Sequence, residues 1–150
     1  MSKKIILIQA DRLICVSIGS MVSFLKYKNM SIQNFQEINA WKKAHELVLM
    51  VYKLTSLYPK HEIFGLVSQS RRCAVSVPSN IAEGYRRNSN ADSLHFYNMS
   101  QGSLEELRYQ LLLAKDLGYI QQEKYDQASA LAGETSKLLN AWIKSQKSFN

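Results

Sequence analysis

The residues most suggestive of chemistry are six cations that occur as three adjacent pairs. They are Lys42, Lys43, Arg71, Arg72, Arg86 and Arg87. Lys and Arg contact phosphates by charge and hydrogen bonds, so these pairs indicate binding to a nucleic-acid backbone with little base readout. On a straight helix Arg72 and Arg86 would lie within about 40° of each other, and Tyr85 and Tyr109 could add stacking surface. The alternative is a solvated charged face whose cations pair with neighbouring carboxylates.

A second group combines small and polar residues on two predicted helices. Its members are Ser76, Pro78, Ser79, Asn80, Glu83, Gly84, Gly102, Ser103 and Glu106. Proline inside a helix removes a donor, so we expect a kink at Pro78 or two abutting helices. The favoured interpretation is structural: small residues allow close helix approach, and polar side chains replace the hydrogen bonds that Pro78 disturbs. A ligand pocket among the same polar side chains, as in a small-molecule enzyme, is the alternative.

Residues typical of catalysis or metal binding are scattered. His45, His61 and His95 fall on separate predicted elements, and Cys15 and Cys73 have no metal-ligand or disulfide spacing. The sequence has no P-loop, no G-x-G-x-x-G and no G-x-S-x-G motif. It therefore predicts a protein of the reducing cytoplasm that is not an enzyme and needs no metal or cofactor.

The positive charge is unevenly distributed along the 150 residues. The formal net charge is +7, yet residues 1–30 hold five Lys and Arg against one Asp, which leaves fourteen against eleven in residues 31–150. A short apolar run in residues 5–8 is interrupted by Asp11 and Arg12, and neither it nor the next apolar stretch is long enough to span a membrane. The hydrophobic content of 46% is that of an ordinary globular protein.

The first thirty residues follow neither helical nor strand periodicity, so we expect residues 1–30 to be an extension outside a folded domain of residues 31–150. The extension could be a mobile or loosely docked arm, or a segment that touches a membrane. The third and favoured interpretation is non-native sequence created by a start codon placed too early, with Met30 as the true start.

Four amphipathic helices account for the remaining sequence. Apolar residues recur at spacings of three and four in residues 35–58, 62–84, 89–117 and 125–142. Ser89 followed by Asp92 resembles a capping box at the start of the third helix, whose end is marked by a glycine at 118. Short connections make neighbouring helices antiparallel, so the prediction is an all-α, antiparallel up-down four-helix bundle. The third helix has more apolar residues than one core requires, which favours self-association.

Four stretches of this sequence resemble one known family. They are residues 35–41, 58–66, 70–84 and 102–119, and the most specific is Pro-Ser-Asn-Ile-Ala-Glu-Gly at 78–84. Over about residues 33–145 the chain resembles the bacterial 23S ribosomal RNA intervening-sequence proteins, a group that includes the accessory variability determinants of diversity-generating retroelements. The resemblance implies a four-helix bundle that assembles into a barrel-shaped homopentamer with a basic surface.

In the retroelement members this assembly binds nucleic acid and a reverse transcriptase. The expected function is therefore that of a homo-oligomeric protein that binds structured RNA or DNA through the six paired cations and has no membrane partner. The alternative is a protein-interaction scaffold, such as an accessory subunit of a reverse transcriptase, without nucleic-acid binding of its own.

Overall fold

In the computed structural model the described residues are 5–9, 12–16 and 32–147. The chain divides into two compact units, residues 1–33 and 34–150, and each is described by itself. The predicted boundary at residue 30 and the proposed start at Met30 lie outside the described residues, so both stay predictions. None of the helices in the described part is long and apolar enough to cross a membrane.

The first unit contains a β-hairpin that the periodicity did not predict. Strand β1 (Ile5–Gln9) pairs antiparallel with β2 (Arg12–Val16), in a register that sets Ile5 opposite Val16 and Gln9 opposite Arg12. Half of the ten strand residues are β-branched isoleucine or valine, and such residues favour strands even where polar and apolar positions do not alternate. Intrinsic β-propensity was thus the signal that a search for periodicity overlooked.

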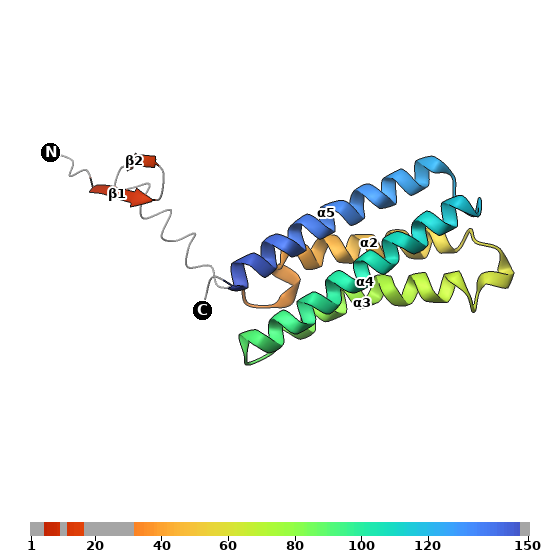
Figure 1. The fold of residues 1–150 in the computed structure, drawn as a ribbon, viewed down its shortest axis with the longest axis horizontal. Coiled ribbons are helices and arrows are strands. Elements are labelled where there is room, and N and C mark those ends of the chain that lie inside the picture. The colour runs from red at the N-terminus through yellow and green to blue at the C-terminus, as the bar shows by residue number, and fades with distance from the viewer. Residues whose placement is uncertain (1–4, 10–11, 17–31, 148–150) are drawn as a thin grey trace. The chain divides into compact units, whose positions relative to one another are not determined.

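The second unit is the predicted bundle of four long helices (Figure 1). They are α2 (Asn39–Thr55), α3 (Leu66–Tyr85), α4 (Asn90–Asp116) and α5 (Gln122–Lys147), and two short 3-10 helices, η1 (Phe35–Glu37) and η2 (Lys60–Glu62), precede α2 and α3. Each long helix packs against the next, and α5 packs back against α2. This closed order confirms the up-down four-helix arrangement. Its core consists mainly of buried aliphatic side chains from all four helices.

Capping residues explain where the helices begin and end. The Ser89 side chain accepts a hydrogen bond from the Asp92 amide, and Gly118 has a φ of 74°, so both predicted ends of α4 are confirmed. The start predicted for α3 at Glu62 is four residues too early. Instead, the Glu62 carboxylate accepts a hydrogen bond of 2.8 Å from the amide of Leu66, the first residue of α3. Such a carboxylate satisfies an amide that has no partner within the helix.

Helix α3 continues through Pro78, so the alternative of two abutting helices is wrong. Side chains supply hydrogen bonds to carbonyl groups next to the proline. Ser100 of α4 donates to the carbonyl of Val77 at 2.8 Å, and Asn80 Nδ2 donates to the carbonyl of Ser76 at 2.8 Å. The carbonyl that loses its helical donor to Pro78 is that of Ala74, four residues earlier, so these two bonds do not replace the missing one. They tie the backbone around the buried proline to α4 and to Asn80.

Candidate nucleic-acid interface

The two arginine pairs lie at opposite ends of α3. Arg71 and Arg72 are in its second turn, whereas Arg86 caps its carboxyl end and Arg87 follows. Fifteen residues of helix span about 22 Å, which is the axial distance from Arg71 to Arg86. Arg72 and Arg86 are both exposed, but no other described arginine or lysine of α3 lies between the pairs. The predicted basic strip is therefore two separate basic points.

The lysine pair near the start of α2 divides between packing and solvent. Lys43 is half-buried, and its ammonium group lies 2.8 Å from the Glu46 carboxylate and 3.4 Å from that of Glu134 on α5. The hydrogen bond to Glu46 raises the Lys43 pKa. Lys42 is exposed, and among the described residues it has no ion pair. Lys43 thus links α2 to α5, and Lys42 is the member of the pair that is available to a phosphate.

The Arg86-Arg87 pair is similarly split. The Arg87 guanidinium forms an ion pair with Glu83 one turn earlier and lies over the Phe96 ring, 4.2 Å from its centroid. Arg86 is exposed, and no described carboxylate forms an ion pair with it. A cavity of about 300 Å³ is lined by Tyr85, Arg87 and the first residues of α4. Within this pair, Arg86 is therefore the cation that is not neutralised.

At the other end of α3, neither arginine pairs with a carboxylate in the described structure. Arg71 is half-buried, its Nε donates to the Thr55 hydroxyl at 2.9 Å, and its Cζ lies 4.8 Å from the centroid of the Tyr52 ring. Arg72 is exposed and donates to the neutral side-chain oxygen of Gln69 at 2.5 Å. Both positive charges are therefore left for an external anion.

The small and polar residues cross-link α3 to α4. Asn80 Nδ2 donates to the Ser76 hydroxyl at 2.9 Å, the Ser76 and Ser103 oxygens are 2.9 Å apart, and Ser103 donates to the Met99 carbonyl at 3.0 Å. These distances form a continuous chain of hydrogen bonds from one helix to the other. Ser79 is exposed, Glu83 pairs with Arg87, and the exposed Glu106 accepts from Gln110 at 3.2 Å.

The two glycines of this group differ sharply. A Cβ atom at Gly84 would lie 2.5 Å from Cε1 of the Tyr97 ring, so glycine is what lets α3 approach α4 there. A Cβ atom at Gly102, near the middle of α4, would meet no heavy atom within 4 Å. Packing inside the bundle explains Gly84, but it gives no reason for Gly102.

Side chains that could bind a metal or act as a nucleophile do not converge. Within the described residues, no three His, Cys, Asp or Glu side chains are placed to hold a metal ion. His45 stacks on Trp41, with ring centroids 5.2 Å apart. Cys73 is buried, and burial raises the pKa of its thiol to about 11, so it is protonated near neutral pH.

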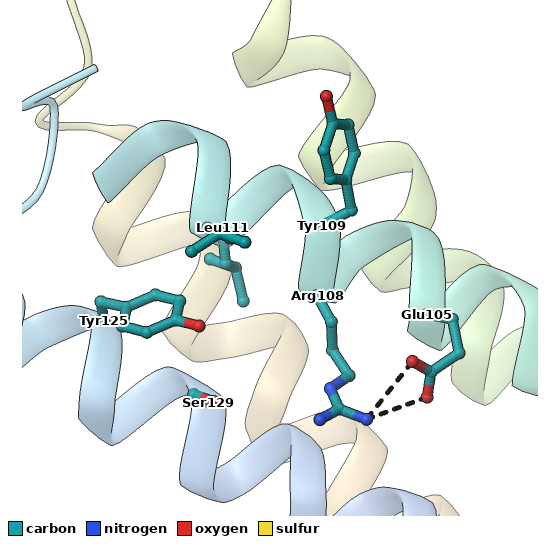
Figure 2. Close-up of a pocket in the computed structure, with 7 residues that line it drawn as sticks. Glu105, Arg108, Tyr109, Leu111, Tyr125 and Ser129 are labelled. Carbon is teal, nitrogen blue, oxygen red and sulfur yellow. Dashed lines mark hydrogen bonds and ion pairs between the residues drawn. The ribbon is translucent and has the colours of Figure 1, made fainter. Parts of the chain in front are cut away.

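A groove between α4 and α5, of about 310 Å³, was not predicted from the sequence (Figure 2). Arg108, Tyr109 and Tyr125 are among the residues that line it, and the Tyr109 ring is directed away from Tyr125. Arg108 Nη1 lies 3.0 and 3.3 Å from the two carboxylate oxygens of Glu105. The two residues are three positions apart on α4, so this ion pair is one that the sequence could have predicted. Since Glu105 neutralises Arg108, this groove offers no net positive charge to a phosphate.

Comparisons with known proteins give one matching family model and a similar solved structure. Residues 36–141 match the family model described as 23S rRNA-intervening sequence protein. A solved structure from Bacteroides thetaiotaomicron, described as a protein with unknown function from the S23 ribosomal protein family, superposes with a TM-score of 0.65 at 26% identity. The match covers 70% of this chain and 98% of that one. No significant match is found among proteins with curated descriptions.

Proposed function

The chain belongs to the 23S rRNA-intervening sequence protein family, and from this premise we propose that it is a non-enzymatic cytoplasmic protein that binds structured RNA. One observation carries the proposal: four of the six paired cations have no carboxylate partner among the described residues. They are Lys42, Arg71, Arg72 and Arg86. Cations that a fold leaves without counter-charges attract the closely spaced phosphates of a nucleic acid.

Phosphate contacts of this kind give affinity but little sequence readout. Three of the four cations lie at two points about 22 Å apart along α3, and Lys42 lies near the start of α2. One copy therefore touches a phosphate backbone at widely separated places. The folded unit has a modest charge excess, and for this reason repetition of the cations in an oligomer is part of the proposal. Several copies around one axis would multiply the phosphate contacts without any change in the single chain.

We propose that the oligomer is a homopentamer built on the exposed side of α3 and α4. Val75, Met99 and Tyr109 are all exposed there. Met99, Gly102, Glu106 and Tyr109 follow spacings of three and four, which aligns them along one side of α4. A mid-helix glycine costs about 1 kcal/mol relative to alanine, and close approach of another copy is a physical reason to keep one at Gly102.

Nucleic-acid binding is tested by fluorescence-anisotropy titration of a structured RNA and a DNA duplex, at low and at physiological salt. The double variant Lys42→Ala and Arg86→Ala should weaken binding and reduce the slope of log affinity against log salt, by about one for each phosphate that the variant no longer touches. Arg108→Ala is the matched control, because Glu105 neutralises that exposed arginine. Equal weakening by both variants, or an unchanged slope, would contradict the assignment of these cations.

Assembly is tested separately by sedimentation velocity. Gly102→Leu should convert the oligomer to smaller species, because the new side chain projects from the proposed contact face. Ala130→Leu is the control, since it places the same side chain at an exposed position of α5. A monomeric wild-type chain, or an oligomer that tolerates Gly102→Leu, would refute the interface.

The exposed apolar face of α4 also favours a second candidate, a scaffold that binds another protein such as a reverse transcriptase. In that case nucleic-acid binding would disappear at physiological salt, while variants of Tyr109 would abolish binding to the partner. The two candidates differ in the binding surface: the unpaired cations bind the partner in the first, and the apolar side of α4 binds it in the second.

A further inference from the structure

A small cavity lies where the carboxyl end of α2 meets the first turns of α3. Its volume is about 180 Å³, and Arg71, Lys60 and Tyr58 are among the residues that line it. Lys60 is exposed at its rim, and the lining contains no Asp or Glu. The cavity is therefore positively charged, in contrast to the neutralised groove between α4 and α5.

The Arg71 guanidinium is held in place by neutral groups. Its Nε donates to Thr55, and its planar group lies over the ring of Tyr52. Neither contact supplies a negative charge, and the terminal nitrogens have no hydrogen bond to a described residue. Partial burial removes some of the favourable hydration free energy of this cation, and no counter-ion compensates for the loss. An anion bound in the cavity would supply the missing charge and accept from these nitrogens.

A polar group without a partner lies in the same lining. Tyr58 is 6% exposed, and its hydroxyl is buried with no hydrogen bond to a described residue. Burial raises the Tyr58 pKa to about 12, so the phenol keeps its proton and can donate. Ser56 also lines the cavity, but its exposed hydroxyl already donates to the Lys53 carbonyl at 2.7 Å. Because the Tyr58 hydroxyl is buried, it lies behind the accessible surface of the recess, and the direct contacts with an anion come from Lys60 and Arg71.

We propose that this cavity binds a phosphomonoester, which under the proposed function is the terminal phosphate of a nucleic-acid strand. The two cations match the charge of −1.5 to −2 that a phosphomonoester carries near pH 7, roughly twice that of an internal phosphodiester. A terminal phosphate has one neighbouring sugar, so it enters a recess of about 180 Å³ more easily than a phosphate flanked on both sides. The apolar side of the recess, formed by Ile63 and Val67, fits the carbon atoms of that one sugar.

The first experiment compares single-stranded RNAs of one sequence that carry a phosphate at the 5′ end, at the 3′ end or at neither. Binding to the full chain, followed by anisotropy, should be about tenfold tighter for a phosphorylated end, the effect of one or two charge-assisted hydrogen bonds. Lys60→Ala and Arg71→Lys should each remove most of that preference. Lys53→Ala is the matched control, because this exposed lysine of α2 does not line the cavity.

The second experiment needs no nucleic acid. Inorganic phosphate, compared with chloride at equal ionic strength, should raise the Tm of the wild-type chain and of Lys53→Ala more than that of Lys60→Ala. Because phosphate stabilises folded proteins in general, the difference in Tm shift between the variants reports binding at this cavity.

The two experiments separate this site from the proposed function. If all three RNAs bind equally, and phosphate raises the Tm of every variant alike, the phosphomonoester site is refuted while nucleic-acid binding stands. If no RNA binds but phosphate protects in a way that depends on Lys60, the site is supported and the proposed function fails.

Discussion

The contrast between Gly84 and Gly102 yields a paired prediction about stability. Replacing each by alanine adds the same methyl group to a helix, but into opposite surroundings. At Gly84 the methyl carbon would lie 2.5 and 2.8 Å from two carbons of the Tyr97 ring and 3.0 Å from the Ser93 carbonyl oxygen. At Gly102 it would have no neighbour within 4 Å.

The expected changes in the free energy of unfolding have opposite signs at the two positions. Alanine is favoured over glycine inside a helix by about 1 kcal/mol, and this gain applies at both positions. At Gly84 the added carbon overpacks the core, which costs about 1–3 kcal/mol, and more where neighbours cannot move. Tyr97 is only 1% exposed and the third neighbour is backbone, so neither can move away cheaply. We expect a net loss of about 2 kcal/mol for Gly84→Ala and a gain of about 0.5–1 kcal/mol for Gly102→Ala.

Urea unfolding followed by circular dichroism measures both effects, and a series of protein concentrations separates folding of the single chain from assembly. A stabilised Gly84→Ala chain would refute the close approach of α3 and α4. A destabilised Gly102→Ala chain would mean that Gly102 has a role within the bundle, or that a contact with another copy contributes to the measured stability. The second explanation requires the destabilisation to grow with protein concentration.

Three further predictions concern single side chains. The Leu66 amide, and after it the Tyr119 hydroxyl, lower the Glu62 pKa, so its stabilisation is present above the ordinary carboxyl pKa and is lost as pH falls through the lowered value. Glu62→Gln should therefore be less stable than wild type at pH 7 and equally stable at low pH, as measured by unfolding at several pH values; a gap independent of pH would contradict this. Because burial raises the Cys73 pKa to about 11, a thiol reagent at pH 8 should react with this residue far more slowly in the folded chain than in urea, as followed by mass spectrometry of its peptide. Ser89→Ala should cost about 1 kcal/mol in thermal unfolding, and Ser89→Asp should restore most of it.

How far the sequence predicts this fold depends on the kind of signal. Periodicity identified all four long helices, because the apolar residues of an amphipathic helix recur every three or four positions whatever the helix packs against. The start of α3 was misplaced because Glu62 is both a helix-favouring residue and a good capping group, and only the hydrogen bond to Leu66 distinguishes the two roles. Ser100, which donates to the Val77 carbonyl beside Pro78, is distant in sequence and becomes a neighbour only on folding.

The candidate site shows the same limit. Adjacent cations are visible in the sequence, but their availability to a ligand is decided by carboxylates on other turns or helices. The charge of Lys43 is compensated in part by Glu134 on α5, ninety-one residues away, whereas that of its neighbour Lys42 is not. No rule about adjacent residues separates these two lysines, since they differ only in the direction in which α2 presents them.

Arg71 is the most informative of the six predicted cations. Water solvates exposed lysines and arginines, so leaving Lys42 or Arg86 without a counter-ion costs the folded chain little. A half-buried guanidinium fixed by Thr55 and Tyr52 is in a different position, because its surroundings have removed water without supplying a negative charge. A carboxylate beside Arg71 would supply this charge within the folded chain, but the cavity lining contains none. A cation kept in this state is better explained by an anion that arrives from outside, and for this reason Lys60 and Arg71 are the residues at which binding and stability should be measured together.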